Sequence, residues 1–536
     1  MEATNKKPHI ASVEQLLASL ELTPAVELPL RLEELIDLER LALLSRLKEA
    51  GLPLAQRQKV ANGLATAKRE GRIGSAPADV SDPPSLSRPD PHPAQPFALC
   101  ARVALPTGKH IRVYAISDAH CDHPANLQWL KTRLPERSEG AFDVCLCAGD
   151  VSDNETTLTA SLRVLKDRFD EVVFVAGNHE IWVKPQPIPG RQPSTTTSLD
   201  RLKEVHILCQ QMGVHVAPLW IECPGEARDV LCVPLNSWYH GEWDCEADLP
   251  GEDEELVRMF QQMWSDYSLC KWPSDLRNGS RALAERFALM NEPTLSALVR
   301  HLPPPPAAGR PPPARRLDKA ETYALYGETP FSTSAWTSVD ADTFFTRRAA
   351  DMFATAEAPG AATGAASAGK QRPYVISLSH MVPRQELIPE KRMLLQPSLH
   401  KVCGSEPLMR QIRQLMPDAH VFGHTHLNMD NTLDGVRYVQ WPLGTPREQR
   451  GQTRVSSFGL MRLYDGGEGG ETPQHWTHWG RHYEEYERDL TKVARPPYVS
   501  QALGAFSGRD KAVRSTWGHE QSLQHAAGAT AVGKSS

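Results

Sequence analysis

The sequence lacks the patterns that mark membrane, secreted and nucleic-acid-binding proteins. No apolar run in its 536 residues approaches the ~20 residues that cross a bilayer, so we expect no membrane partner. The opening segment, residues 1–9, has no apolar core of the kind found in signal peptides. The formal net charge is −6. Without a basic surplus, we expect that nucleic acid is not a partner.

The ten cysteines are scattered without a C-x-x-C…C-x-x-C framework. Cys145, Cys147 and Cys232 alternate within strand-like apolar runs, where cysteine serves as a small hydrophobic residue. Reduced thiols of this kind are typical of the cytosol. We therefore expect a cytoplasmic protein.

Proline and glycine are abundant, with 44 and 35 residues, and they gather in stretches that divide the chain. Such stretches bury too little apolar surface to order themselves, so we interpret them as linkers or disordered segments. Hydrophobic residues make up 40% of the chain, which is enough for a sizeable core elsewhere. The predicted divisions are an all-α helical domain at 12–70, a linker at 71–97, an α/β domain at 98–480 with a low-complexity insertion at about 301–371, and a disordered tail at 500–536.

Residues 12–70 have the leucine pattern of a compact helical unit, and Ser12 with Gln15 forms a capping box at its start. The stretch LKEAGLPLAQRQKV, residues 47–60, resembles the end of a SAM domain, although Ala55 stands where that family prefers glycine. An unrelated helical bundle stays open as the alternative. A SAM-like domain implies a protein partner or self-association through this unit. The residues that match are Gly51, Pro53, Arg57 and Lys59.

Five short polar clusters follow strand-like apolar runs further along the chain. Continuous apolar runs rich in Val, Ile and aromatic residues indicate strands that are buried on both faces. Open α/β sheets place their functional sites at the carboxyl ends of such strands. The runs are IRVYAIS, DVCLCA, EVVFVA, YVISLS and AHVFG, and the clusters that follow them are Asp118-Ala119-His120, Gly149 to Asp153, Gly177-Asn178-His179-Glu180, the lone His380, and Gly423-His424-Thr425-His426.

The residue types in these clusters indicate a metal site. Asp, His and Asn side chains, with no Cys among them, suit hard-to-borderline divalent ions such as Mn, Fe or Zn. Asp118 and His120 stand two residues apart at a strand end, so both are able to turn towards one ion as the chain leaves the sheet. We expect metal ions to be the cofactors of this protein.

The order of the motifs, D-x-H, G-D-x-x-D, G-N-H-E, a single His and G-H-x-H, resembles that of the calcineurin-like metallophosphoesterases over residues 100–470. The resemblance implies an α/β fold in which a β-sandwich is flanked by helices (αββα). It also implies two divalent metal ions. One ion takes Asp118, His120 and His426, the other takes Asn178, His380 and His424, and Asp150 bridges the two.

The same resemblance implies a hydrolase of phosphate esters with a metal-bound hydroxide as nucleophile, because metal ions lower the pKa of bound water to about 7. His179 matches the acid that protonates the leaving alkoxide, and Asp153 matches the residue that orients this histidine. A phosphorylated substrate is the expected partner of the site.

One departure from the family narrows the substrate class. Protein phosphatases of the calcineurin type carry D-R-G at this point, whereas Asp153 is followed by Asn and Glu. The missing arginine argues for small substrates. Arg384 is the candidate that binds phosphate oxygens, with Arg447 as a second choice, and Trp238 is the candidate that holds an organic leaving group. The alternatives are that both arginines pair with surface carboxylates and that Trp238 is a core aromatic residue.

Three functions remain open from the sequence. The leading prediction is a phosphomonoesterase. The first alternative is a phosphodiesterase acting on cyclic nucleotides or nucleic-acid ends. The second alternative is a non-catalytic scaffold that assembles partners through residues 12–70, although a decayed enzyme is expected to have lost ligands and this chain has lost none.

Overall fold

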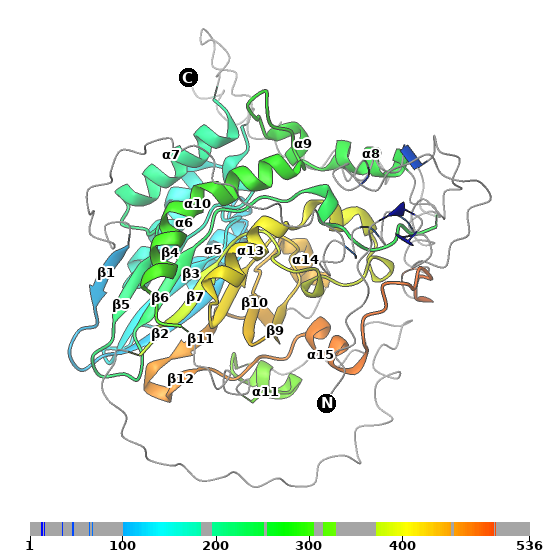
Figure 1. Cartoon of the computed structure of the whole chain (residues 1–536). Helices are drawn as coiled ribbons and strands as arrows, with labels where there is room; N and C mark the ends of the chain where they lie inside the picture. Colours follow the sequence, from blue (N-terminus) through cyan, green and yellow to red (C-terminus); the bar gives the residue numbers. More distant parts are fainter. Residues whose placement is uncertain are drawn as a thin grey trace, which may run out of the picture.

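The computed structural model contains two β-sheets packed face to face, with helices over both outer faces (Figure 1). This arrangement confirms the predicted αββα sandwich. The structure describes residues 100–183, 196–250, 254–304, 315–327, 371–451, 455–497 and 499, and isolated positions between 12 and 67. The predicted SAM-like domain and linker lie almost wholly outside the described residues, and the predicted tail at 500–536 lies wholly outside them.

A seven-stranded sheet and a five-stranded sheet form the sandwich. The larger sheet has the spatial order β1 (Ala101–Ala104), β5 (Leu219–Glu222), β6 (Val230–Pro234), β7 (Tyr374–Leu378), β8 (Ala419–Phe422), β10 (Val436–Gln440) and β9 (Met429–Leu433). The smaller sheet has the order β12 (Gly470–Glu471), β11 (Met461–Asp465), β2 (His110–Ile116), β3 (Ala141–Cys147) and β4 (Glu171–Phe174).

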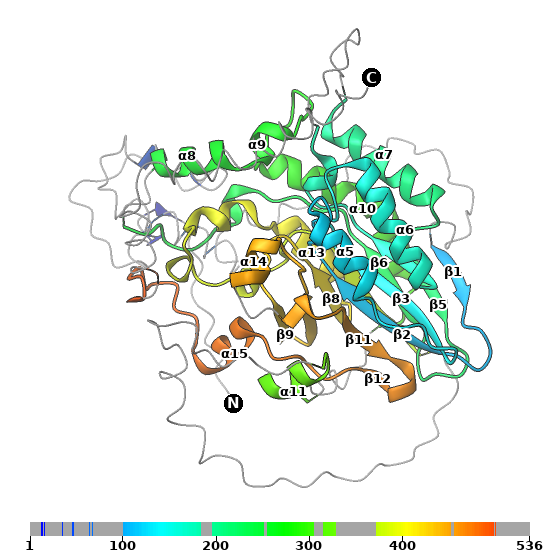
Figure 2. The same ribbon diagram turned by 180° about the vertical axis from the view of Figure 1, so that it is seen from behind.

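The helices pack on the outer faces of the two sheets. α5 (Pro124–Thr132) and α6 (Glu155–Arg168) cover the smaller sheet, which faces the reader in Figure 2, and α10 (Arg281–His301) and α13 (Glu406–Leu415) cover the larger one. Within the described part of the chain, no helix is long and apolar enough to cross a membrane. The other helices are α7 (Ser198–Gln211), α8 (Glu254–Met263), α9 (Asp266–Leu269), α11 (Lys319–Ala324), α14 (Pro446–Gly451) and α15 (His478–Glu485).

Strand β2 shows how the sequence produces two separate apolar layers. Successive side chains of a strand point to opposite faces of its sheet. Ile111, Val113 and Ala115 therefore pack in the core between the two sheets, whereas Tyr114 and Ile116 pack against the helical layer. Because both faces are covered, β2 is apolar nearly throughout, as the continuous run in the sequence predicts.

Parallel pairing brings the polar clusters to one edge of the sandwich. β2, β3 and β4 run parallel to one another, as do β6, β7 and β8. All five predicted strands that precede a polar cluster are present, as β2, β3, β4, β7 and β8. Ahead of β5, which begins at Leu219, His215 makes only an isolated bridge to Val173.

The segment between β6 and β7 contains helices that the sequence prediction did not assign. In α10, Leu283, Phe287, Leu295 and Leu298 are buried at helical spacing, and Pro293 lies inside the helix. We call residues 241–304 the insertion. It carries α8, α9 and α10.

The predicted low-complexity segment at 301–371 begins where the insertion just defined ends, and part of it is ordered. Residues 315–327 include α11, whose Tyr323 is fully buried among core residues, and Tyr326 stacks on Trp441 with ring centroids 6.1 Å apart. These tyrosines supply the apolar surface that allows this short segment to pack on the core. Residues 305–314 and 328–370 lie outside the described residues.

We expect Tyr323→Ala to lower the free energy of unfolding by about 3 kcal/mol or more, because a large aromatic side chain is removed from a packed core. Urea denaturation measures the change. The matched control is Leu325→Ala, since Leu325 is 57% exposed and surface substitutions change stability by only about 0.5 kcal/mol. Equal stability of the two variants would contradict the packing of α11 on the core.

Candidate metal centre

The loops that follow the strands hold their side chains in an unusual backbone conformation. Seven non-glycine residues in the described part of the chain have positive φ, and five of these are predicted metal ligands. A left-handed conformation is costly for residues other than glycine and tends to occur at functional sites. The five ligands with their φ angles are Asp118 (49°), His120 (41°), Asp150 (53°), His424 (80°) and His426 (55°).

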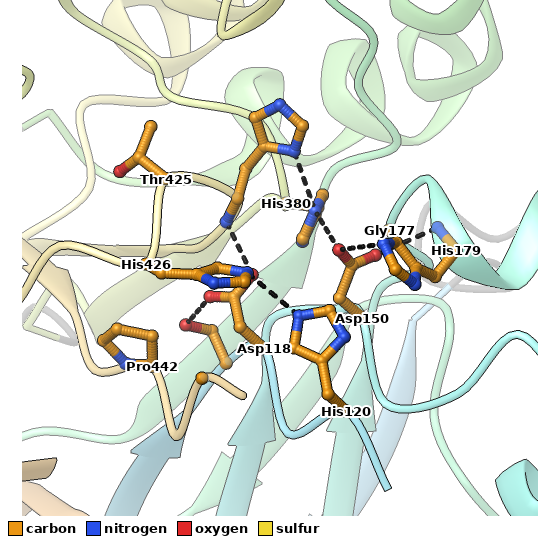
Figure 3. A network of polar contacts seen from close by, with 12 residues as sticks. Asp118, His120, Asp150, Gly177, His179, His380, Thr425, His426 and Pro442 are labelled. Carbon is orange, nitrogen blue, oxygen red and sulfur yellow. Dashed lines mark hydrogen bonds and ion pairs between the residues drawn. The ribbon is translucent and has the colours of Figure 1, made fainter. Parts of the chain in front are cut away.

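One group of donor atoms joins Asp118, His120, Asp150 and His426, with its ligand atoms within 4.8 Å of one another. The Nε2 atoms of His120 and His426 lie 2.9 Å apart, and Nε2 of His426 lies 3.5 Å from Oδ1 of Asp118 (Figure 3). The three side chains assigned to the first ion therefore converge on one point, together with Asp150.

A second group joins Asp150, His380 and His424. Nε2 of His380 lies 3.3 Å from Oδ2 of Asp150. Oδ1 of Asn178 lies 3.1 Å from Nε2 of His380 and 3.1 Å from Nδ1 of His424. The structure thus brings together all seven predicted ligands. Asp150 belongs to both groups, which is the geometry that a bridging carboxylate requires.

Hydrogen bonds on the far side of each imidazole fix which nitrogen faces the centre. His380 donates from Nδ1 to the carbonyl of Ala148 at 2.8 Å, and His424 donates from Nε2 to the carbonyl of Val402 at 2.8 Å. A carbonyl only accepts, so these nitrogens carry a proton and the opposite nitrogens face the cluster. His426 has a carboxylate partner instead, Glu448 on α14, 2.9 Å from its Nδ1. Such outer partners are typical of metal-binding histidines.

The electrostatics of the cluster favour cation binding. Burial, together with His380, lowers the pKa of His424 to about 3, so this imidazole is neutral, as a metal ligand must be. Burial opposes a charge on His380, but the adjacent Asp150 raises its pKa to about 10. In turn, although burial favours the neutral acid, His179 and His380 hold the pKa of Asp150 well below its ordinary value. Asp150 therefore draws positive charge, and a metal ion competes with the proton on His380. The oxygen and imidazole donors, without thiols, suit divalent metal ions.

The profile of the calcineurin-like phosphoesterase family matches residues 111–428. The chain belongs to this family. The family is that of phosphoesterases, and its members use divalent metal ions of the kind that this cluster suits.

Among curated proteins, the chain is similar to the [acyl-carrier-protein] phosphodiesterase PptH of Mycobacterium tuberculosis, with 32% identity over 127 residues. This alignment covers 23% of the chain and 37% of that relative, so little more than a third of the relative is matched. Two solved structures show a weaker likeness. Phosphopantetheinyl hydrolase PptH of Mycobacterium tuberculosis has a TM-score of 0.40 and 17% identity, and covers 67% of this chain and 97% of its own. A putative 5'-nucleotidase of Staphylococcus aureus has a TM-score of 0.24 and 10% identity, with 62% and 48% covered.

The last residue of the family motif G-N-H-E, Glu180, holds the loop that carries Asp150. Its buried carboxylate accepts hydrogen bonds from the backbone N–H groups of four residues. Next to it, Gly177 must be glycine, because a Cβ there would lie 2.1 Å from Oδ1 of Asp150. The sequence prediction gave Glu180 no role, although its place in the motif was a signal. The four donors are Asp150 (3.0 Å), Val151 (2.6 Å), Ser152 (2.9 Å) and Gly177 (2.7 Å).

His179 lies at the edge of the cluster, where a substrate is able to reach it. Its side chain is 22% exposed, its ring stacks on Trp182 with centroids 3.7 Å apart, and its Nε2 lies 3.7 Å from Oδ2 of Asp150. The backbone N–H of Asp153 donates to Asp122 at 3.1 Å. The orienting role of Asp153 stays a prediction. Trp182 is a stacking partner that the sequence prediction missed.

The two predicted substrate-binding residues, Trp238 and Arg384, both have partners away from the metal cluster. Trp238 is 1% exposed, stacks on Phe287 with centroids 5.5 Å apart, and donates from Nε1 to Asn278, so it belongs to the core beneath the insertion. Arg384 pairs with Glu386 at 2.8 Å and Asp434 at 2.6 Å. Its guanidinium is engaged by carboxylates rather than directed at the metal cluster. Neither position was readable from the sequence, because both depend on tertiary neighbours.

We expect Glu180→Gln to destabilise the protein by about 2–3 kcal/mol, because the new amide group faces backbone donors instead of accepting from them. The measurement belongs at pH 8, since burial and the nearby Asp150 raise the pKa of Glu180 to about 7. Chemical denaturation is compared with Glu139→Gln, an exposed glutamate. Unchanged stability of Glu180→Gln would show that the loop is held by other contacts.

Proposed function

We propose that this chain hydrolyses phosphodiesters at a centre of two divalent ions, drawn from Mn, Fe and Zn. The observation that carries the proposal is the presence of Asp150 in both donor groups. When bound, the two ions stabilise negative charge on the phosphate and activate a water molecule for in-line attack. We assign the first ion to Asp118, His120 and His426, and the second to Asn178, His380 and His424.

The ligand set supports binding of an anionic substrate. Only Asp118 and Asp150 contribute negative charge, so two dications leave the centre with about two positive charges. The remaining ligands are neutral. An ionised phosphate ester is attracted to such a centre and is held beside His179, which is partly exposed at its edge.

Two observations favour a phosphodiester over the phosphomonoester of the leading sequence prediction. Arg384, the residue expected to bind phosphate oxygens and so to favour a monoester with its further free oxygen, is instead paired with Glu386 and Asp434. The curated relative is named as a phosphodiesterase whose substrate is an acyl carrier protein. We therefore propose a diester that links an organic group to a larger molecule, with a phosphopantetheinyl carrier protein as the first substrate to test.

A pair of aryl substrates tests the class of ester. We expect kcat/KM for methyl p-nitrophenyl phosphate to exceed that for p-nitrophenyl phosphate by at least about tenfold, because both share a leaving group and differ only in the second ester bond. Asp150→Asn serves as the control for contaminating activity and is expected to abolish turnover. Preference for the monoester would restore the phosphomonoesterase prediction. Turnover that survives Asp150→Asn would contradict the proposed centre.

His179 is proposed as the acid that protonates the leaving group. We expect His179→Ala to leave metal content near normal and to slow hydrolysis of an alkyl diester by about 10²–10⁴-fold, the usual contribution of general acid catalysis. The loss should be much smaller for a p-nitrophenyl ester, whose leaving group needs no proton. His123→Ala, in a neighbouring loop, is the matched histidine control. Equal losses on both substrates would remove His179 from this role.

A further inference from the structure

The insertion contributes a buried carboxylate beside the metal cluster, Asp266, that belongs to none of the family motifs. Asp266 opens α9 and is 1% exposed. It accepts four hydrogen bonds from side chains. Oδ1 accepts from Nδ2 of Asn178 at 3.0 Å and Nε1 of Trp182 at 2.7 Å, and Oδ2 accepts from the hydroxyl of Tyr239 at 2.9 Å and Nε1 of Trp264 at 2.8 Å.

These four donors fill the acceptor positions of an ionised carboxylate, which offers about four lone-pair sites. Two of the donors are indole N–H groups and one is an amide, and none of these three is able to accept a hydrogen bond through the nitrogen concerned. An amide in place of the carboxylate would set its own NH₂ against two of the donors. The site is therefore built for the charged oxygen pair of an aspartate.

The bond to Asn178 decides which end of that amide faces the metal cluster. An asparagine side chain offers an oxygen that binds cations and an NH₂ group that does not. Asp266 engages the NH₂ group, so Oδ1 points at His380 and His424, 3.1 Å from a nitrogen of each. Asp266 thus holds the amide in the orientation that presents its oxygen to the cluster.

The other donors of Asp266 surround the same half of the site. The ring of Trp182 lies against that of His179 with centroids 3.7 Å apart, Trp264 contacts the ring of His424 edge-on at 5.9 Å, and Tyr239 stacks on that ring at 6.1 Å. The carboxylate of Asp266 thus holds the aromatic side chains around His424. It also holds Trp182, which packs against His179.

We propose that Asp266 is a positioning residue for the second metal ion, acting through the amide of Asn178. The proposal rests on the two-ion centre of the proposed function. Under this proposal the insertion is part of the metal site. Helix α9 holds Asp266 in place, and Asp266 orients Asn178 towards the second ion.

The test is Mn²⁺ binding to the full chain, measured by isothermal titration calorimetry and by metal analysis after gel filtration. Wild type is expected to bind two ions. Asp266→Asn is expected to weaken the second ion by about 10–100-fold, the usual effect of losing an outer partner of a ligand, and to leave the first ion unchanged. The matched control is Asp275→Asn, which removes the same charge from an exposed position in the insertion and should bind both ions normally.

A double-mutant cycle separates positioning from general support of the fold. In an Asn178→Ala background, Asp266→Asn should not weaken binding of the second ion any further, because the amide through which Asp266 acts is absent. If Asp266→Asn does not fold, Asp266→Ala, which removes the acceptor without adding a donor, is measured in the same way with the same expected loss. Two tightly bound ions in the Asp266 variant, or a full further loss in the Asn178→Ala background, would overturn this proposal alone. Wild type that binds one ion would overturn the two-ion centre and this proposal with it.

Discussion

Asp150 is the point on which both halves of the site depend. Its carboxylate belongs to each of the two donor groups, and its backbone is held at φ 53°, a conformation that costs about 1–3 kcal/mol. The four backbone N–H groups that donate to Glu180 offset this cost, since hydrogen bonds to a charged group each contribute about 1.5–3 kcal/mol. The carboxylate of Glu180 thus stabilises the strained loop through its backbone N–H groups. The side chain of Asp150 is left to face the metal ions.

The sandwich supplies the geometry that makes this sharing possible. Parallel strands of both sheets end at one edge, so loops that are far apart in the sequence meet there, with Asp118 and Asp150 from the smaller sheet facing His380 and His424 from the larger one. The insertion adds support from outside the sheets through Asp266. The motifs therefore provide the predicted ligands, and in our proposal a residue outside the motifs, Asp266, sets the orientation of one of them, Asn178.

Most of the fold around the site follows from the sequence, because strands buried on both faces leave continuous apolar runs, and polar residues directly after them mark the carboxyl ends. The seven predicted ligands, which the resemblance to the family named, lie together for the same reason. The positions of Trp238 and Arg384 were not readable from the sequence, since their surroundings are made by residues such as Phe287 and Asp434 that are distant in the sequence. Asp266 left no local signal at all: its role arises from four donors that only tertiary structure brings together.

The central claim, that Asp150 bridges two ions, is tested most directly by electron paramagnetic resonance of the protein loaded with two equivalents of Mn²⁺. Two ions that share a carboxylate are close enough to couple magnetically. We predict the spectrum of an exchange-coupled pair, which reverts to that of isolated Mn²⁺ when only one equivalent is present. A spectrum of isolated Mn²⁺ at two equivalents, with both ions bound, would contradict a shared Asp150.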